Sequence, residues 1–168
     1  MDTKDKDNTL PPGEQEFALL VRRHKTTVYT VCYMFADGQD EVADLVQDVL
    51  LNLWQGFGRF EGRSDTRTWV YRVALNTCIT HDRKRRRRVA TIPLTMDINP
   101  YTDDDANSRQ MERLRRRIAR LGPFDRAIVM LWLEDMNYDD IGAIVGITPR
   151  NVGVRLVRIR ERLKQMTD

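Results

Sequence analysis

Two clusters of arginine carry the most distinctive chemistry of this sequence. The segment HDRKRRRR occupies residues 81–88, and residues 150–164 read RNVGVRLVRIRERLK. Arginine presents a planar fork of N–H donors that pairs with phosphate oxygens and with the edge of guanine. Acidic residues collect elsewhere, at 40–48 and 97–105, although the formal net charge is only +3. This segregation of charge, more than the total, indicates a polyanionic partner.

Groups that would support catalysis or metal binding are scattered. Cys32 and Cys78 form no CxxC motif, and His24 and His81 lack the spacing of metal ligands. We interpret the cysteines as small core residues of a protein in a reducing cytosol. The carboxylates at 103–105 lie in a stretch without a hydrophobic face. We therefore expect no enzyme activity, no metal and no other cofactor.

The first thirteen residues, MDTKDKDNTLPPG, are polar and contain two adjacent prolines. They lack the apolar core of a signal peptide, and no apolar stretch approaches the roughly 20 residues of a transmembrane helix. We predict a disordered segment at 1–13 and a cytoplasmic protein that does not insert into membranes.

The hydrophobic periodicity predicts an all-α protein. Apolar residues recur three and four positions apart over 14–35 and again over 42–54, and a third helix is expected from about Thr68 into the first basic run. No stretch alternates convincingly with a period of two. The second stripe consists of Val42, Leu45, Val46, Val49, Leu50, Leu53 and Trp54.

The periodicity fails between residues 89 and 107, where two prolines and an acidic cluster leave no helical face. We interpret this stretch as a flexible linker. It would separate an N-terminal domain, residues 14–88, from a C-terminal domain, residues 108–168.

The end of the sequence predicts a helix-turn-helix. Asn137 can cap a helix whose third residue is Asp140, and Thr148 with Pro149 is a favourable start for a second helix. Two short helices joined by a tight turn that contains glycine, the second rich in arginine, form such a unit.

A helix that begins at Pro149 would have a buried and an exposed side. The expected buried residues are Val152, Leu156, Ile159 and Leu163. The expected exposed residues are Arg150, Asn151, Val154, Arg155 and Arg158. A solvated helix with charge pairs is the alternative interpretation, but the preceding unit at 138–148 favours base-edge contacts in a major groove.

Three segments resemble the signatures of the extracytoplasmic-function (ECF) bacterial sigma factors. They are EVADLVQDVLLNLWQGFGRFEG at 41–62, TWVYRVALNTCITHDRKRR at 68–86 and LEDMNYDDIGAIVGITPRNVGVRLVRIRERL at 133–163. The resemblance implies a bacterial, cytoplasmic protein that binds core RNA polymerase and directs it to promoters. The N-terminal domain would recognise and melt the minus-ten element, and the C-terminal domain would read the minus-thirty-five element.

The resemblance also assigns the acidic helix a partner. Asp44, Gln47 and Asp48 match the positions that contact the coiled-coil clamp helices of the polymerase beta-prime subunit, and further contact with the beta flap is implied. Leu51, an apolar residue opposite the buried stripe, is consistent with such a surface. The residues expected to bind core polymerase are Asp44, Gln47, Asp48, Leu51, Trp54 and Gln55.

The loop FEGRSDT, residues 60–66, resembles the family's pocket for a base flipped out of the minus-ten element, and Asn76 matches an asparagine that lines this pocket. Unstacking a base costs about a few kcal/mol, which aromatic contacts, edge hydrogen bonds and phosphate attraction must offset. We interpret Trp69 as a core residue, and Tyr71 and Arg72 as better surface candidates.

The basic run is expected to continue or closely follow the third helix and to meet promoter phosphates. Like charges four residues apart repel, so we expect it to fray until an anion arrives. The expected minus-ten residues are Phe60, Arg63, Ser64, Tyr71, Arg72, Asn76, Arg83, Lys84, Arg85 and Arg86.

The expected minus-thirty-five residues are Arg150, Asn151, Gly153, Val154, Arg155 and Arg158. Gly153 and Val154 depart from the family, in which Lys or Arg and Ser are common at these positions, so no relative's promoter preference can be copied. We hypothesise that Gly153 permits close approach to the DNA backbone.

Other functions are compatible with parts of the sequence. A free-standing helix-turn-helix regulator would bind a palindromic duplex without polymerase, and a small nuclease would need a clustered carboxylate or histidine site that the sequence does not offer. ECF sigma factors are commonly inhibited by an anti-sigma factor, so such a partner is also expected.

Overall fold

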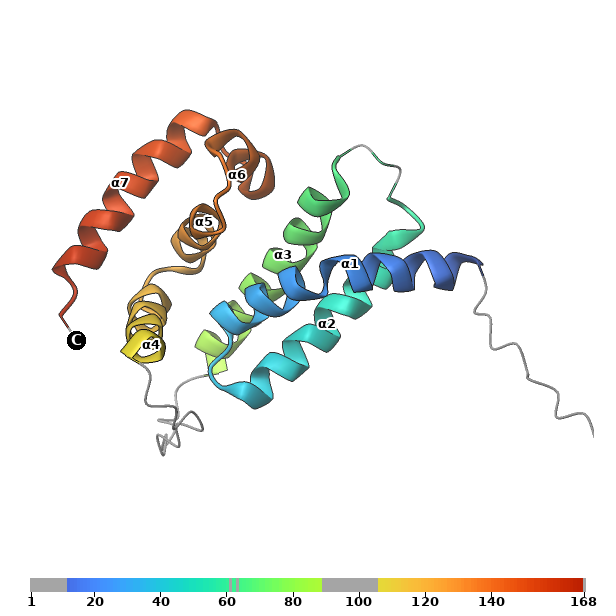
Figure 1. The fold of residues 1–168 in the computed structure, drawn as a ribbon, viewed down its shortest axis with the longest axis horizontal. Helices are drawn as coiled ribbons and strands as arrows, with labels where there is room; N and C mark the ends of the chain where they lie inside the picture. Colours follow the sequence, from blue (N-terminus) through green and yellow to red (C-terminus); the bar gives the residue numbers. More distant parts are fainter. Residues whose placement is uncertain (1–11, 61, 63, 89–105, 168) are drawn as a thin grey trace, which may run out of the picture.

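The computed structural model describes residues 12–60, 62, 64–88 and 106–167. Throughout this part of the chain the regular structure is α-helical, as the periodicity predicts (Figure 1). None of the described helices is both long and apolar enough to cross a membrane. The helices are α1 (Pro12–Phe35), α2 (Gln39–Phe57), α3 (Thr66–Arg88), α4 (Ala106–Ala119), α5 (Pro123–Leu133), α6 (Tyr138–Val145) and α7 (Pro149–Gln165).

The predicted disordered segment and the predicted linker fall outside the described residues, apart from their ends. Residues 12–13 belong to the first turn of α1, and residues 106–107 to the first turn of α4. The prediction of disorder or flexibility elsewhere in these segments stays a prediction.

Helices α1, α2 and α3 pack on one another and form the N-terminal domain. Each helix contributes apolar side chains to a shared core, among them Phe35 of α1, Leu45 and Leu53 of α2, and Val70 of α3. The predicted stripe of α2 faces this core, with Val46 and Leu50 half-buried, and only Trp54 at its end lies 44% exposed.

The two cysteines are core residues, as predicted. Cys32 of α1 and Cys78 of α3 are buried free thiols. A hydrogen bond with Cys32 and burial together raise the pKa of Cys78. A buried thiol with a raised pKa forms little thiolate, the reactive form, so both observations fit a structural role for Cys78.

Helices α4 to α7 form the C-terminal domain, in which α6 and α7 are the predicted helix-turn-helix. Both predicted caps form: the Asn137 side chain accepts a hydrogen bond from the Asp140 backbone N–H at 2.8 Å, and the Thr148 hydroxyl accepts one from the Asn151 N–H at 3.3 Å. Each cap satisfies a backbone donor that the first helical turn leaves unpaired.

Two glycines shape the turn between α6 and α7. Gly146 ends α6 with a φ of 81°, in the left-handed region that glycine adopts without strain. A Cβ atom on Gly142 would lie 2.5 Å from the carbonyl oxygen of Ile147, so the chain can fold back this closely only at a glycine. The turn fixes the angle between α6 and α7.

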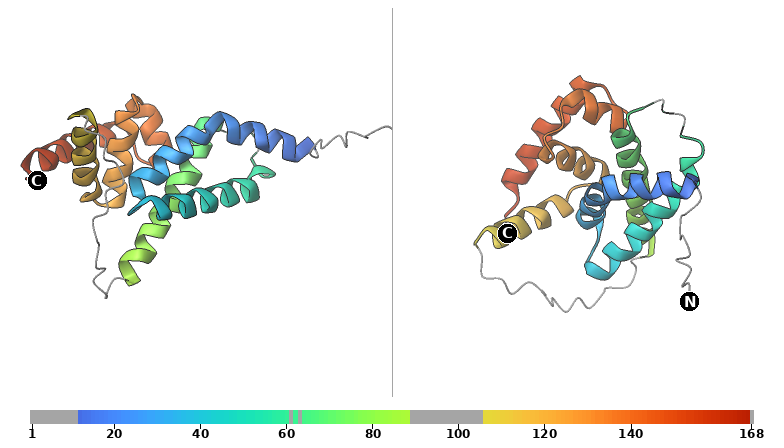
Figure 2. Two further views of the ribbon diagram at one scale, coloured as in Figure 1. Left: turned by 60° about the horizontal axis from the view of Figure 1, so that its bottom comes forward. Right: turned by 45° about the vertical axis from the view of Figure 1, so that its right-hand side comes forward.

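The two domains are in contact. Helices α5 and α6 lie against α3, and α4 lies against the end of α1. Figures 1 and 2 show α1–α3 on one side of the molecule and α4–α7 on the other, with α3 at the boundary.

Candidate nucleic-acid and polymerase interfaces

Helix α7 has the two sides that the sequence predicts. Val152, Leu156 and Ile159 are buried, and Leu163 is half-buried. The exposed side carries Arg150, Asn151, Val154, Arg155 and Arg158. Guanidinium and amide donors on an exposed helix after a tight turn can hydrogen-bond to base edges in a major groove.

Arg155 is held by the beginning of α5. Its Nη1 donates to Oδ1 of Asp125 at 2.8 Å, and its guanidinium lies 4.7 Å from the centre of the Phe124 ring. Arg162 Nη1 lies 3.7 Å from the other oxygen of Asp125. Asp125 thus neutralises part of the positive charge of α7.

Gly153 packs against α6. A Cβ at this position would lie 3.2 Å from Cε2 of Tyr138, closer than most side chains approach. Close packing of α6 on α7 is therefore a second explanation for the glycine, and the hypothesis that it permits approach to the DNA backbone stays a prediction.

The outer face of α2 gathers the residues expected to bind polymerase. All six, Asp44, Gln47, Asp48, Leu51, Trp54 and Gln55, are exposed. Leu51 is 54% exposed, and the Trp54 ring meets Phe17 edge to face with centroids 5.0 Å apart. Because carboxylates repel phosphate and exposed apolar residues favour protein contacts, this surface suits a protein better than DNA.

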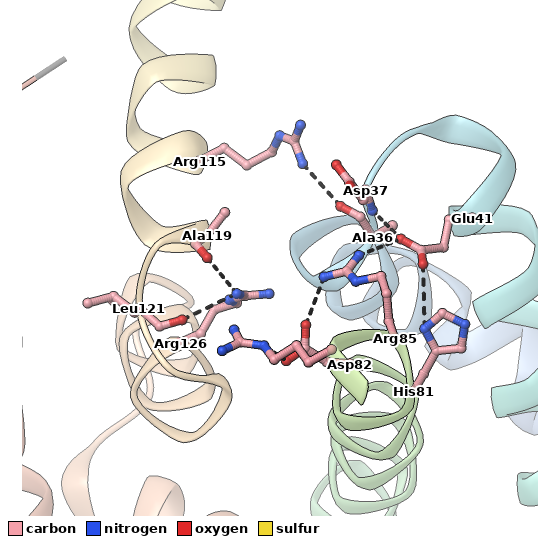
Figure 3. A network of polar contacts seen from close by, with 11 residues as sticks. Ala36, Asp37, Glu41, His81, Asp82, Arg85, Arg115, Ala119, Leu121 and Arg126 are labelled. Carbon is pink, nitrogen blue, oxygen red and sulfur yellow. Dashed lines mark hydrogen bonds and ion pairs between the residues drawn. The ribbon is translucent and has the colours of Figure 1, made fainter. Parts of the chain in front are cut away.

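The basic end of α3, residues 83–88, continues the helix, one of the two arrangements that we expected, and its fraying without an anion stays a prediction. Asp82, only 1% exposed, pairs with Arg85 at 2.8 Å and with Arg86 at 2.9 Å. Glu41 of α2 pairs with Arg85 at 2.9 Å, and His81 Nδ1 lies 3.5 Å from the same carboxylate (Figure 3). These carboxylates offset the repulsion between the arginines.

The ion pairs divide the basic residues expected to contact phosphate into those already engaged by carboxylates and those that are exposed. Arg85 is half-buried and engaged by two carboxylates, whereas Arg83 and Lys84 are exposed. Asp82 could have been recognised in the sequence, since it stands three and four residues before the arginines that it binds.

Of the aromatic residues near the loop at 60–66, Trp69 lies as expected and Tyr71 does not. Phe60 stacks on half-buried Trp69 with centroids 4.6 Å apart, which agrees with Trp69 as a core residue. Tyr71 is only 2% exposed, so its interpretation as a surface residue is wrong. It shares the inward side of α3 with Ala74 and Cys78, at helical spacing. Ser64 is half-buried, and Arg63 lies outside the described residues.

Arg72 and Asn76 are exposed residues of α3 that border a cleft between the two domains. Arg72 Nε donates to the carbonyl oxygen of Ala143 in α6 at 3.0 Å, and its Nη2 donates to the same oxygen. The cleft has a volume of about 600 Å³. Its polar and charged lining residues are Arg72, Asn76, Thr80, Arg83, Asp125 and Arg155.

Two arginines at the domain boundary were not anticipated. Arg126, only 2% exposed, donates from Nη2 to the carbonyl oxygens of Ala119 at 2.6 Å and Leu121 at 3.3 Å. Burial lowers the pKa of Arg126, and the nearby Asp82 carboxylate opposes this effect. Arg115 reaches the N-terminal domain directly. The only sequence signal for a buried Arg126 was the position of this cation within the largely apolar segment PFDRAIVMLWL, residues 123–133.

Comparison with known proteins agrees with this division into two parts. Residues 20–88 match the family description Sigma-70 region 2, and residues 111–163 match Sigma-70, region 4. The chain belongs to the sigma-70 family, in its ECF group. Two recognisable regions in this order do not favour a free-standing regulator.

Individual relatives are distant. The chain is 29% identical to the ECF sigma factor SigE of Mycolicibacterium smegmatis over 157 residues, which cover 86% of this chain and 59% of SigE. It is 28% identical to SigG of Mycobacterium tuberculosis over 151 residues, 85% of this chain and 39% of SigG. It is 27% identical to SigW of Bacillus subtilis over 172 residues, 93% of this chain and 92% of SigW. The chain therefore spans well under two thirds of some of the relatives that it matches.

Solved structures share the fold. CnrH, in complex with the cytosolic domain of CnrY, superposes with a TM-score of 0.67 at 22% identity, covering 90% of this chain and 86% of CnrH. RpoE, in complex with the anti-sigma factor NepR from Bartonella quintana, gives a TM-score of 0.66 at 22% identity, covering 90% of this chain and 94% of RpoE.

Proposed function

We propose that this ECF sigma factor binds core RNA polymerase through the outer face of α2 and directs it to promoters, where the N-terminal domain melts the minus-ten element and α7 reads the minus-thirty-five element. The observation that carries the proposal is the coexistence, in one chain with both sigma-70 regions, of an acidic and apolar face on α2 and a basic exposed face on α7. Its place of action would be the bacterial cytoplasm, where promoter DNA lies.

The chemistry of the faces supports this division of roles. Carboxylates beside Leu51 and Trp54 on α2 favour a protein partner, for which the beta-prime clamp helices are the expected candidate. In the C-terminal domain, Trp132 and Leu133 are exposed at the end of α5, and the Arg160 guanidinium of α7 lies 5.7 Å from the centre of the Trp132 ring. These two neighbouring apolar residues are candidates for the expected contact with the beta flap.

An anti-sigma factor is a further proposed partner. Both structural relatives were solved in complexes, CnrH with the cytosolic domain of CnrY and RpoE with the anti-sigma factor NepR. A partner that covered the α2 face would compete with polymerase for the same carboxylates and for Leu51.

The test of the function is transcription in vitro from genomic DNA with core polymerase plus the purified chain. We expect promoter-specific transcripts, and a gel shift on those promoters that is strong only when core polymerase is present. Specific binding to a palindromic duplex without polymerase, together with no transcripts, would contradict the proposal and support the free-standing regulator.

The interface on α2 is tested by reversing its charge. Asp44→Arg with Asp48→Arg should abolish assembly with core polymerase without altering the helical circular dichroism, because both side chains are exposed and opposite the core. The matched control is Glu14→Arg with Glu16→Arg, which changes the same number of exposed carboxylates on α1. Normal assembly of the α2 double variant would remove the interface assignment.

A further inference from the structure

The outward side of α7 has an apolar centre, although the helix is rich in arginine. Val154 is 45% exposed and Val157 is 62% exposed. They stand three residues apart, so their side chains are neighbours on the helix surface. Single exposed apolar residues are common on proteins, but these two form a patch on the face that the proposed function turns toward DNA.

Two arginines border the valine pair. Arg150 precedes Val154 by four residues and Arg158 follows it by four, so these side chains lie on one face of α7. Both arginines are exposed and have no ion-pair partner among the described residues. The patch therefore lies between two cations that are available to phosphate or to base edges.

Two other arginines lie at the flank of α7 that faces α5. Asp125 of α5 pairs with Arg155 at 2.8 Å and with Arg162 at 3.7 Å, and the Phe124 ring lies against the Arg155 guanidinium. These contacts hold both side chains toward α5. The outward face is therefore left to the valines and the two arginines that border them.

The major groove of DNA offers one apolar partner for such a patch. Every base pair presents hydrogen-bond donors and acceptors there, and an A·T pair adds the C5 methyl group of thymine. A valine against a G·C pair would displace water from polar groups without replacing their hydrogen bonds, which costs free energy. A valine against the thymine methyl buries apolar surface on both sides. Both effects favour A·T pairs.

The position and stiffness of the valines suit this contact. Both lie in the first half of α7 (Pro149–Gln165), and the N-terminal part of a recognition helix is the part that meets base edges. Valine has a nearly fixed χ1 angle in a helix, so its methyl groups are held in place before DNA binds. Glu161, one turn beyond Val157, pairs with Lys164 at 3.1 Å. A carboxylate is repelled by phosphate, so the apolar contact with bases should end before Glu161.

We propose that Val154 and Val157 are specificity-determining residues that recognise thymine methyl groups in the minus-thirty-five element. This inference rests on the proposed function of α7, and it names base pairs that the helix prefers: A·T pairs next to those contacted by Arg150 and Arg158. The valines are about 4.5 Å apart along the helix axis, and base pairs stack about 3.4 Å apart. The two side chains can therefore meet the methyl groups of neighbouring base pairs.

The test removes the apolar contact from each side in turn. Promoters transcribed by core polymerase with the full-length chain are synthesised with each upstream thymine replaced singly by deoxyuridine, which lacks only the C5 methyl. Val154→Ser and Val157→Ser remove the contact from the protein, and serine has nearly the same helix preference as valine. Leu19→Ser, at a 63% exposed position of α1, is the matched control. Filter binding by the holoenzyme measures affinity, and circular dichroism confirms that each variant is folded.

We expect deoxyuridine at one or two upstream positions to weaken binding by the wild-type holoenzyme about three- to fivefold for each methyl. Val154→Ser or Val157→Ser should weaken binding to the thymine promoter at least as much. The position that each valine reads should then tolerate deoxyuridine without a further loss. Leu19→Ser should keep both the wild-type affinity and the wild-type response to deoxyuridine.

Three results would overturn methyl recognition: no upstream thymine whose methyl group matters, an equal effect of deoxyuridine in the wild type and in both serine variants, or weaker holoenzyme assembly by the serine variants without a change in base preference. The last result would show that the patch binds a protein. Failure of the proposed function has a different signature, the absence of core-dependent transcripts from genomic DNA with the wild-type chain, and it would remove this inference as well.

Discussion

The basic end of α3 and the helix α7 are similar in sequence and different in structure. Both concentrate arginine, yet Arg85 and Arg86 in α3 are engaged by Asp82, and Arg85 also by Glu41. In α7, Asp125 of α5 engages Arg155 and Arg162, whereas Arg150 and Arg158 are exposed and have no ion-pair partner among the described residues. The comparison teaches that the density of arginine does not decide its availability, because a carboxylate on the same face can occupy the guanidinium before any phosphate does.

Removal of the buried carboxylate should have the largest effect. Asp82→Asn removes the buried carboxylate that Arg85 and Arg86 share, and leaves Arg85 with Glu41 alone. We expect the free energy of unfolding to fall by about 2–4 kcal/mol, somewhat less than for a fully buried pair because the arginines can turn to water. Urea denaturation followed by circular dichroism measures the change.

The control for Asp82 is Glu161→Gln in α7. Glu161 forms an exposed pair with Lys164 at 3.1 Å, and such a pair contributes about 0–1 kcal/mol. Similar losses of unfolding free energy in the two variants would show that Asp82 stabilises the fold no more than an exposed carboxylate of α7. The contrast between the basic end of α3 and α7 would then be wrong.

Gly142→Ala tests what positions the arginines of α7. Its Cβ would lie 2.5 Å from the Ile147 carbonyl oxygen, and because the neighbour is backbone, the turn must open. We expect the unfolding free energy to fall by about 1–3 kcal/mol and upstream promoter recognition to weaken as α7 moves.

Gly13→Ala is the matched substitution at a helical glycine with open space around its Cβ. It should be neutral or stabilising by up to about 1 kcal/mol, because alanine favours the helix. A Gly142→Ala protein as stable as this control would show that the turn does not require glycine.

The helices and the two sides of α7 could be predicted from the sequence because they depend on local order. Periodicity placed Val152, Leu156 and Ile159 inside, and the types of Asn137 and Thr148 predicted their caps. Each of these patterns lies within a short stretch of the chain, so that stretch alone contains all the residues needed to recognise it.

The sites depend on partners that are distant in sequence, and there the predictions were incomplete. Tyr71 was misplaced because an amphipathic aromatic residue is compatible with either side of α3, and the packing of α1 and α2 decided the outcome. The contact of Arg72 with Ala143 joins residues 71 positions apart. No periodicity within α3 could have indicated it.

The two helices should also differ in how they bind DNA. Arg158→Ala should lower affinity by about 1–3 kcal/mol for promoters with the preferred upstream bases and less for others, if it reads a base edge. Arg83→Ala should weaken binding about equally for all sequences and reduce the salt dependence by about one phosphate contact. Filter binding by the holoenzyme at several salt concentrations measures both.

Arg85→Ala refines this prediction within α3. Because Arg85 is already paired with Asp82 and Glu41, its loss should change the salt dependence less than the loss of Arg83. A larger change for Arg85 would mean that phosphate displaces the carboxylates, and the basic end of α3 would then resemble α7 after all.

Gly153→Ala should have the smallest effect, since two contributions oppose each other. Alanine is favoured over glycine in a helix by about 1 kcal/mol, but the new methyl group would lie 3.2 Å from the Tyr138 ring, which must shift by a few tenths of an ångström. We expect the midpoint of urea unfolding to stay nearly unchanged in Gly153→Ala. In a Tyr138→Leu background the ring is absent, so the same substitution should stabilise the protein by roughly the full helix preference. If Gly153→Ala instead left stability unchanged in both backgrounds but lowered DNA affinity in both, the glycine would serve the approach of DNA, and the explanation from packing of α6 on α7 would be wrong.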